Sequence, residues 1–148
     1  MRTIVLSFLL SVLLTGKSAW LNDLDEAKRL AREQHEFILL NFSGSDWCGP
    51  CIKMHDEVFE SESFRQYAAS HLILVNADFP RLKKNQLSRD LQKKNDALAD
   101  QYNRKGIFPC TLLLDSTGRV IQTWEGFFSG GGQRFIEQIQ NELSGKAE

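Results

Sequence analysis

Trp47-Cys48-Gly49-Pro50-Cys51 is the stretch that decides how the rest of this chain is interpreted. Two cysteines separated by two residues can close a small disulfide and open it again. The apolar run Phe37–Phe42 before them is typical of a buried strand, and the run Ile52–Phe59 after them is compatible with a helix. Cys48 is therefore expected at or beside a helix N-terminus, where unpaired N–H groups and the helix dipole favour a thiolate. Because the thiolate is the nucleophile of thiol–disulfide exchange, the sequence predicts that Cys48 attacks a substrate disulfide and that Cys51 resolves the mixed disulfide.

Two other interpretations of the cysteine pair remain open at this point. A static disulfide that closes so short a loop would constrain the unfolded chain little, so the stabilising motive is weak. A metal site could use Cys48, Cys51 and His55, but a structural zinc needs a fourth ligand, and the sequence has no second Cys-x-x-Cys. We therefore expect neither a metal nor a cofactor.

Composition bounds the class of protein. The chain has 148 residues, of which 42% are hydrophobic and 25% charged, and these values are typical of one globular domain with a proper core. The formal net charge of -1 gives no basic excess that would indicate a nucleic-acid partner.

The N-terminus predicts export. Arg2 is followed by the apolar run Ile4–Leu14 and then by small and polar residues up to Ala19. This pattern is typical of a secretory signal peptide, so we divide the chain into a signal peptide (1–19) and a single domain (20–148). An uncleaved membrane anchor is the alternative, but the run is shorter than the roughly 20 residues of a membrane span. We expect a periplasmic or secreted bacterial protein without stable membrane insertion after cleavage.

The rest of the chain alternates helical and strand patterns. Strands separated by helices imply parallel pairing, and the last two strands are expected to form an antiparallel hairpin. Ser129–Gly132 is expected to be a flexible loop. The predicted elements are a helix capped by Asn22 or Asp23 and reaching Gln34, a short helix to Ala69 capped by Ser61 or Ser63, strand Leu72–Val75, helix Leu87–Tyr102, strand Thr111–Leu114, strand Arg119–Trp124 and a final helix containing Phe135 and Leu143.

This order, with Trp-Cys-Gly-Pro-Cys after the first long strand, resembles the thioredoxin family, and in particular its exported bacterial thiol:disulfide oxidoreductases. The resemblance covers roughly Asn22 to Leu143 and implies an α/β three-layer sandwich with a mixed central sheet between helices. Gly106-Ile107-Phe108-Pro109 resembles the family's cis-proline loop, which faces the redox pair and docks an extended substrate segment.

The resemblance also implies roles for residues around the pair. Trp47, Gly49, Pro50, Phe108 and Pro109 match positions that bind substrate in the family. Two neighbours are possible modulators. Asp46 could raise the pKa of Cys48 by charge repulsion, and Cys110 stands where threonine commonly follows the cis-proline. Strand alternation places Cys110 on one face with Leu112 and Leu114, so a small buried hydrophobe is the alternative.

Two further features distinguish the chain from cytosolic thioredoxin. No acid occurs in Phe37–Ser45, whereas cytosolic thioredoxins carry a buried aspartate there, so deprotonation of Cys51 must use water or another group. The stretch Arg81–Lys94 contains six basic residues against only Asp90. It is interpreted either as a solvated helix face or as a docking surface for an acidic partner.

Together these features predict a protein-disulfide reductase that works outside the cytoplasm. Gly49 and Pro50 match the reducing type of pair. The resemblance implies a membrane thiol-relay protein as electron donor and oxidised exported proteins as substrates. A client-binding or chaperone module that uses Trp47 and the Pro109 loop without essential redox turnover is the alternative function.

Overall fold

The computed structural model describes residues 19–145, so the signal-peptide prediction falls on residues of which only Ala19 is described. No helix within the described range is long and apolar enough to cross a membrane. The elements are, in chain order, α1 (Leu24–Gln34), β1 (Phe37–Ser43), α2 (Gly49–Met54), the π-helical turn η1 (His55–Phe59), α3 (Glu62–His71), β2 (Leu72–Asp78), the 3₁₀ turn η2 (Lys83–Asn85), α4 (Arg89–Tyr102), β3 (Cys110–Leu114), β4 (Val120–Glu125) and α5 (Gly131–Ser144).

A four-stranded mixed sheet forms the middle layer, with the strand order β2-β1-β3-β4. β1 runs parallel to β2, and its last residue, Ser43, pairs with Asp78. On its other side β1 runs antiparallel to β3, so that Phe42 pairs with Cys110. β3 and β4 form the expected antiparallel hairpin.

The expected parallel orientation of the third strand is wrong. β2 ends beside Ser43, and β3 begins beside Phe42, so the segment 79–109 starts and finishes at the C-terminal end of β1. Because the connection returns to the end of the sheet that it left, β3 must run in the opposite direction to β2. The helix α4 within this connection therefore does not take the chain to the opposite end of the sheet, as a parallel crossover would require.

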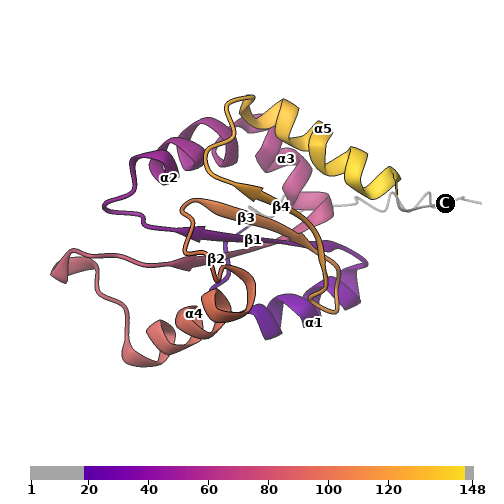
Figure 1. The fold of residues 1–148 in the computed structure, drawn as a ribbon. Coiled ribbons are helices and arrows are strands. Elements are labelled where there is room, and N and C mark those ends of the chain that lie inside the picture. The colour runs from indigo at the N-terminus through magenta and orange to yellow at the C-terminus, as the bar shows by residue number, and fades with distance from the viewer. Residues whose placement is uncertain (1–18, 146–148) are drawn as a thin grey trace, which may run out of the picture.

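Helices cover both faces of the sheet (Figure 1). One apolar cluster joins α1 to inward-facing strand residues such as Ile38, Leu40 and Leu112, with side chains of α4 packed against it. The other joins Leu39 and Leu113 to side chains of α3 and α5 and of the helix that follows the cysteines. The alternation of Ile38, Leu39 and Leu40 between the clusters shows that β1 is buried on both faces, as its continuous apolar sequence predicts.

Several helix boundaries follow the predicted capping residues. The Asp23 side chain accepts hydrogen bonds from the backbone N–H groups of Asp25 and Glu26 at the start of α1. The Ser61 hydroxyl accepts from the Phe64 N–H at the start of α3, which resolves the choice between Ser61 and Ser63. These short-range contacts satisfy donors that have no partner inside the helix.

Two segments differ from the sequence prediction. The helix after the cysteines is α-helical only to Met54 and then continues as the π-helical turn η1. Ser129–Gly132 is not entirely a loop, because α5 already begins at Gly131. Gly132 is buried against Ser61, and a Cβ atom there would collide with the Ser61 hydroxyl. The close approach of α5 to the start of α3 therefore requires glycine at this position, although glycine has a low propensity for helix interiors.

Phe135 is the aromatic centre of the cluster formed by α3 and α5. It is fully buried, and its ring contacts those of Phe59, Phe64, Trp124 and Phe128. We expect Phe135→Ala to lower the free energy of unfolding by about 3–5 kcal/mol, because the truncation leaves a cavity among these rings. Urea denaturation of the oxidised protein measures this loss. Val120→Ala, at a side chain that is 43% exposed, is the control and is expected to cost less than about 1 kcal/mol. Equal losses in the two variants would contradict this account of the core.

Candidate active site

The cysteine pair lies at the start of α2, as predicted. Cys48 and Cys51 form a disulfide, and their residues are only 5% and 4% exposed. Cys48 is the N-cap of the helix, and its Sγ accepts a hydrogen bond of 3.2 Å from the Cys51 N–H. Pro50 occupies the first turn, where its missing N–H costs little. The same N–H group that meets the sulfur in the oxidised form can stabilise a Cys48 thiolate in the reduced form.

An aromatic cluster borders the pair. The indole Nε1 of Trp47 donates a 2.7 Å hydrogen bond to the carbonyl oxygen of Phe79. The Trp47 and Phe108 rings meet edge to face with centroids 5.6 Å apart, and Phe108 also meets Phe79 at 5.5 Å. Gly44 lies under the indole, and a Cβ atom there would collide with the ring. The structure thus brings Trp47 and Phe108, two predicted substrate-binding residues, into contact.

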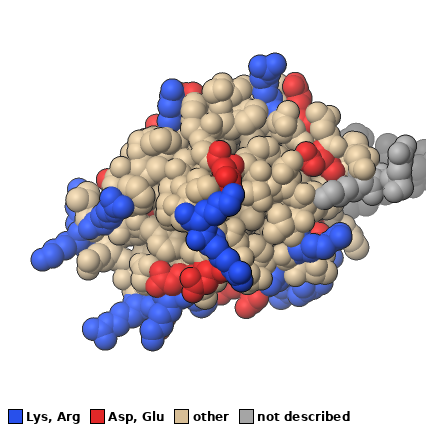
Figure 2. Space-filling view, in the orientation of Figure 1, with Lys and Arg blue, Asp and Glu red and all other residues tan. Residues whose placement is uncertain are grey.

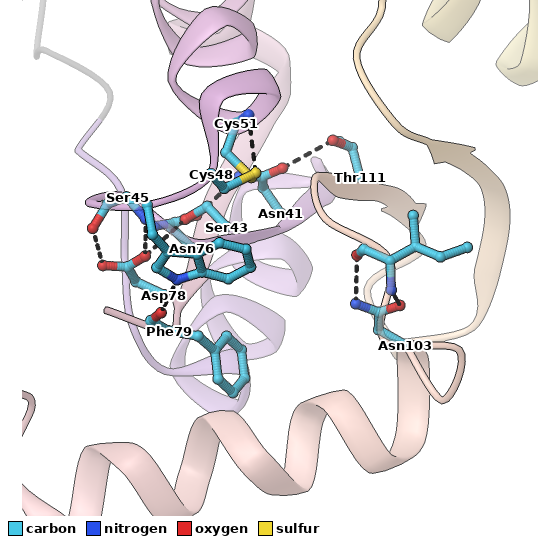
Figure 3. Close-up of a disulfide and its surroundings, with 12 residues drawn as sticks. Asn41, Ser43, Ser45, Cys48, Cys51, Asn76, Asp78, Phe79, Asn103 and Thr111 are labelled. Atoms are coloured by element: carbon cyan, nitrogen blue, oxygen red, sulfur yellow. Dashed lines mark hydrogen bonds between the residues drawn. A yellow bond between two sulfur atoms is a disulfide. The ribbon is translucent and has the colours of Figure 1, made fainter. Parts of the chain in front are cut away.

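The predicted cis-proline loop is confirmed, because the Phe108–Pro109 peptide bond is cis. Asn103, which is 6% exposed, fixes the approach to this bond. Its side-chain amide donates to the Ile107 carbonyl at 2.8 Å, and its oxygen accepts from the Ile107 N–H at 3.1 Å (Figure 3). The Pro109 carbonyl then accepts from the Gly126 N–H at 2.8 Å, which ties the loop to the end of β4.

A polar network lies on the strands behind the disulfide (Figure 3). The Asn41 side chain donates to Asn76 at 3.0 Å and accepts from the Thr111 hydroxyl at 2.9 Å. The Ser43 hydroxyl lies 3.1 Å from both Asn76 and Asp78. Neighbouring strands β2, β1 and β3 supply these groups, and mutual hydrogen bonds offset the cost of burying them.

Cys51 and members of this network line one cavity of about 370 Å³. No carboxylate lines it, which agrees with the absence of an acid in Phe37–Ser45. The polar side chains in its lining, among them Asn41, Ser43 and Asn76, can bind water close to Cys51. The lining residues are Trp20, Asn41, Ser43, Ser45, Cys51, Ile52, His55, Phe59 and Asn76.

The carboxylate of Asp46 engages the segment after β2. It accepts hydrogen bonds from the N–H groups of Arg81 and Leu82, at 2.9 and 3.0 Å, and from the Asn85 amide at 3.0 Å. These bonds, first of all the one from the Arg81 N–H, hold the pKa of Asp46 below its usual range. Its predicted influence on the pKa of Cys48 stays a prediction, whereas its contact with Arg81 and Leu82 is a role that the sequence did not indicate.

Cys110 lies on the other side of the sheet from α2. It packs with Leu112 and Leu114 in the α1 cluster, as strand alternation predicts, whereas Met54 of α2 packs in the opposite cluster. It is 2% exposed, and burial raises the pKa of its thiol to about 11. This environment favours the interpretation of Cys110 as a small buried hydrophobe over that of a third thiol beside the redox pair.

His55, the candidate third metal ligand, has acidic neighbours. Its Nδ1 lies 3.1 Å from Asp56 and its Nε2 lies 3.6 Å from Glu60. Within residues 19–145, no group of three or more His, Cys, Asp or Glu side chains is arranged to hold a metal ion.

The sequence indicated the cysteines and the proline loop but missed their supports. Asn103, Asn76 and Asp78 stand far from the motif in sequence, at positions where no local pattern marks a polar contact. The one available signal was that Asn76 and Asp78 interrupt the apolar strand pattern at its carboxyl end, where parallel strands gather functional groups.

Comparison with known proteins identifies the class to which this fold and site belong. The sequence profile of a family described as thioredoxin-like matches residues 19–116. The chain therefore belongs to the thioredoxin-like family. Its Cys48–Cys51 disulfide is the redox pair of a thiol:disulfide oxidoreductase.

Individual relatives narrow this assignment to homologues of a disulfide reductase. The chain is 36% identical to the disulfide bond reductase DsbH of Chlamydia pneumoniae over 118 residues, which are 80% of this chain and 69% of DsbH. It is 30% identical to the thioredoxin-related protein DsbJ of the same organism, of whose length it spans only 34%. A solved DsbH oxidoreductase superposes with a TM-score of 0.78 and 30% identity, covering 97% of this chain and 94% of that one.

A more distant structural likeness shows the fold alone. The oxidised C-terminal domain of Neisseria meningitidis DsbD superposes with a TM-score of 0.53 at 20% identity, covering 79% of this chain and 90% of that domain. The predicted three-layer sandwich with a mixed sheet is thus confirmed.

Asp46→Ala is expected to free the segment that Asp46 holds. Because the Arg81 and Leu82 amides lose their acceptor, their protection from hydrogen exchange should fall by about tenfold. The lowered pKa means that this tie is present above the usual aspartate range and is lost as pH falls through the folded-state value. Hydrogen exchange followed by NMR measures the effect. Asp96→Ala, which removes only a contact with Gln92 on α4, is the control. Unchanged exchange at both amides would contradict the assigned role.

Cys110 is expected to be chemically silent. With a thiol pKa of about 11, only about one thiol in a thousand is ionised at pH 8, so iodoacetamide should alkylate Cys48 of the reduced protein long before Cys110. Peptide mass mapping over time measures the order. Cys110→Ala should leave the reduction potential unchanged, and a shift of more than about 30 mV would instead support a modulating role.

Proposed function

We propose that this chain reduces disulfide bonds of exported proteins, outside the cytoplasm of a bacterium. The observation that carries the proposal is the pair itself. Cys48 caps α2, and its sulfur accepts a hydrogen bond from the Cys51 N–H. Trp47, the residue before Cys48, contacts Phe108. The relative DsbH is named a disulfide bond reductase, which supports the direction of transfer. The signal-peptide pattern of residues 1–19 supports export.

The proposed reaction transfers two electrons to the substrate. The Cys48 thiolate attacks one sulfur of a substrate disulfide, which forms a mixed disulfide and releases the other substrate sulfur as a thiolate. Cys51 then loses its proton and attacks the Cys48 sulfur, which releases the second substrate thiolate and leaves the Cys48–Cys51 disulfide. The two protons lost by the cysteines balance those taken up by the two substrate thiolates.

The cavity beside Cys51 is the proposed proton route of the second step. Cys51 is 4% exposed but lines the cavity together with the amides and hydroxyls of Asn41, Ser43 and Asn76. A neutral lining does not hold a negative charge beside Cys51, so the thiolate forms there without like-charge repulsion. Water in the cavity would accept the proton in place of the aspartate found in cytosolic thioredoxins.

Repeated turnover requires an electron donor outside the cytoplasm. We propose a membrane thiol-relay protein, which would reduce the Cys48–Cys51 disulfide by the same exchange in reverse. Gly49 and Pro50 are exposed at the start of α2, so either partner can approach the pair from this side. Substrates and donor would then use one face in turn.

Redox titration tests the proposed direction. At equilibrium with dithiothreitol or glutathione, we expect a potential nearer to about −270 mV than to about −120 mV, and a value above about −150 mV would overturn the assignment as a reductant. Cys48→Ser should abolish turnover of a protein disulfide, and Cys51→Ser should accumulate the mixed disulfide. Cys110→Ala is the matched control, with one cysteine removed and turnover retained. A Cys48→Ser variant with full activity in cells would favour the client-binding alternative.

A further inference from the structure

The segment 79–88 between β2 and α4 is attached directly to the active-site motif. Asp46 accepts hydrogen bonds from the backbone of Arg81 and Leu82, and Trp47 donates to the Phe79 carbonyl. Asp46 and Trp47 are the two residues before Cys48. The segment is therefore held next to the redox pair by four contacts, the Asn85 amide being the fourth.

The cationic groups of this segment have no acidic partners. Arg81, Lys83 and Lys84 are exposed and form no ion pair with any residue in the range 19–145. Lys94, in the same basic stretch, is instead bound to Asp23 at 2.6 Å. Figure 2 shows Lys and Arg side chains projecting from the left edge of the molecule, where Figure 1 draws this segment. The charge that Arg81–Lys84 carries is thus available to another molecule.

The side chain of Arg81 places a positive charge beside the redox site. Its guanidinium lies 3.6 Å from the centre of the Trp47 ring, a cation–π contact that fixes the group over the aromatic residue beside Cys48. A substrate that reaches Trp47 therefore meets a positive charge at the same place. Apolar side chains flank the site as well, because Leu82 is 47% and Ile52 44% exposed.

The unpaired charge continues along the start of α4. A cavity of about 390 Å³ lies between the segment and this helix, and it is lined by Pro80, Gln86, Leu87, Arg89, Gln92 and Lys93. Arg89 and Lys93 form no ion pair with any residue that the structure describes. A basic surface with a hollow lined by Arg89, Lys93 and two glutamines suits an extended chain that bears carboxylates.

We propose that the segment 79–88, with the start of α4, is a docking surface for an acidic stretch of the client protein that flanks its disulfide. The inference rests on the proposed reductase function. Asp or Glu residues of the client would lie against Arg81, Lys83 and Lys84 while its disulfide reaches Cys48. Because long-range attraction between exposed charges acts mainly on encounter, the surface raises kcat/KM for acidic substrates and is weakened by salt.

Two disulfide-bonded peptides that differ only in having Glu or Gln beside the cysteines test the proposal. With dithiothreitol as reductant, the protein should reduce the Glu peptide with a kcat/KM about tenfold higher at low ionic strength, and 0.5 M NaCl should remove most of the difference. Lys83→Gln/Lys84→Gln should lose part of the preference, and Lys83→Glu/Lys84→Glu should abolish or reverse it. All variants should reduce the small uncharged hydroxyethyl disulfide as the parent protein does.

Lys28→Glu/Arg32→Glu on α1 is the matched control. It makes the same change in charge, but its side chains lie beside the 115–118 turn, at the other end of β3 from Cys110. The preference for the Glu peptide should survive there. A Glu-to-Gln ratio near one in the parent protein, or a ratio that Lys83→Glu/Lys84→Glu leaves unchanged, would overturn the docking surface. Equal rates for the two peptides, combined with Lys83-dependent binding to anionic phosphatidylglycerol vesicles, would also overturn the proposal, because the surface would then recognise a membrane. If neither peptide is reduced, the reductase function itself fails.

Discussion

The hydrogen bonding of β1 on both edges is the constraint on which the rest of the structure depends. Its parallel register with β2 pairs Ser43 with Asp78, and its antiparallel register with β3 pairs Phe42 with Cys110. Three strand ends therefore meet at one edge of the sheet, directly before the loop that carries Cys48. A shift of one residue in either register would turn each side chain of β1 to the opposite face of the sheet relative to its neighbours. Both faces of β1 are apolar. The site is thus built at the end of the sheet where the polar side chains of Asn41, Asn76 and Thr111 lie next to each other.

The polar network at this end of the sheet is the basis of the proposed proton route without a buried acid. Asn41, Asn76, Ser43 and Thr111 satisfy one another, and the carboxylate of Asp78 lies at the end of the network, bound by Ser43 and Ser45. Neutral groups behind Cys51 leave its thiolate without a neighbouring negative charge, and the cavity connects the thiol to solvent. The carboxylate of Asp78 instead holds the loop before Cys48, because it accepts a hydrogen bond from the Ser45 N–H.

The motif residues before Cys48 organise a surface as well as a reaction centre. The carboxylate of Asp46 is bound by the Arg81 and Leu82 N–H groups and by the Asn85 amide, and within residues 19–145 it forms no ion pair with a lysine. Trp47 contacts Phe108 on one side and Arg81 on the other. One indole therefore joins the cis-proline loop to the basic segment, so the proposed substrate site and the proposed acidic docking surface would be continuous.

The sequence by itself determined the features that depend on neighbours within a few residues. The redox pair, the helix start at or beside Cys48, and the caps narrowed to Asn22 or Asp23 and to Ser61 or Ser63 were predicted, because each pattern spans about one helical turn. The cis-proline loop was predicted from the resemblance to the thioredoxin family. Alternation of side chains also placed Cys110 with Leu112 and Leu114. Only the tertiary structure decided the direction of β3, the helical start at Gly131 and the partners of Asp46. These features depend on residues more than thirty positions apart or on the close approach of two elements. Strand order and packing bring such groups together, and no local sequence pattern encodes either of them.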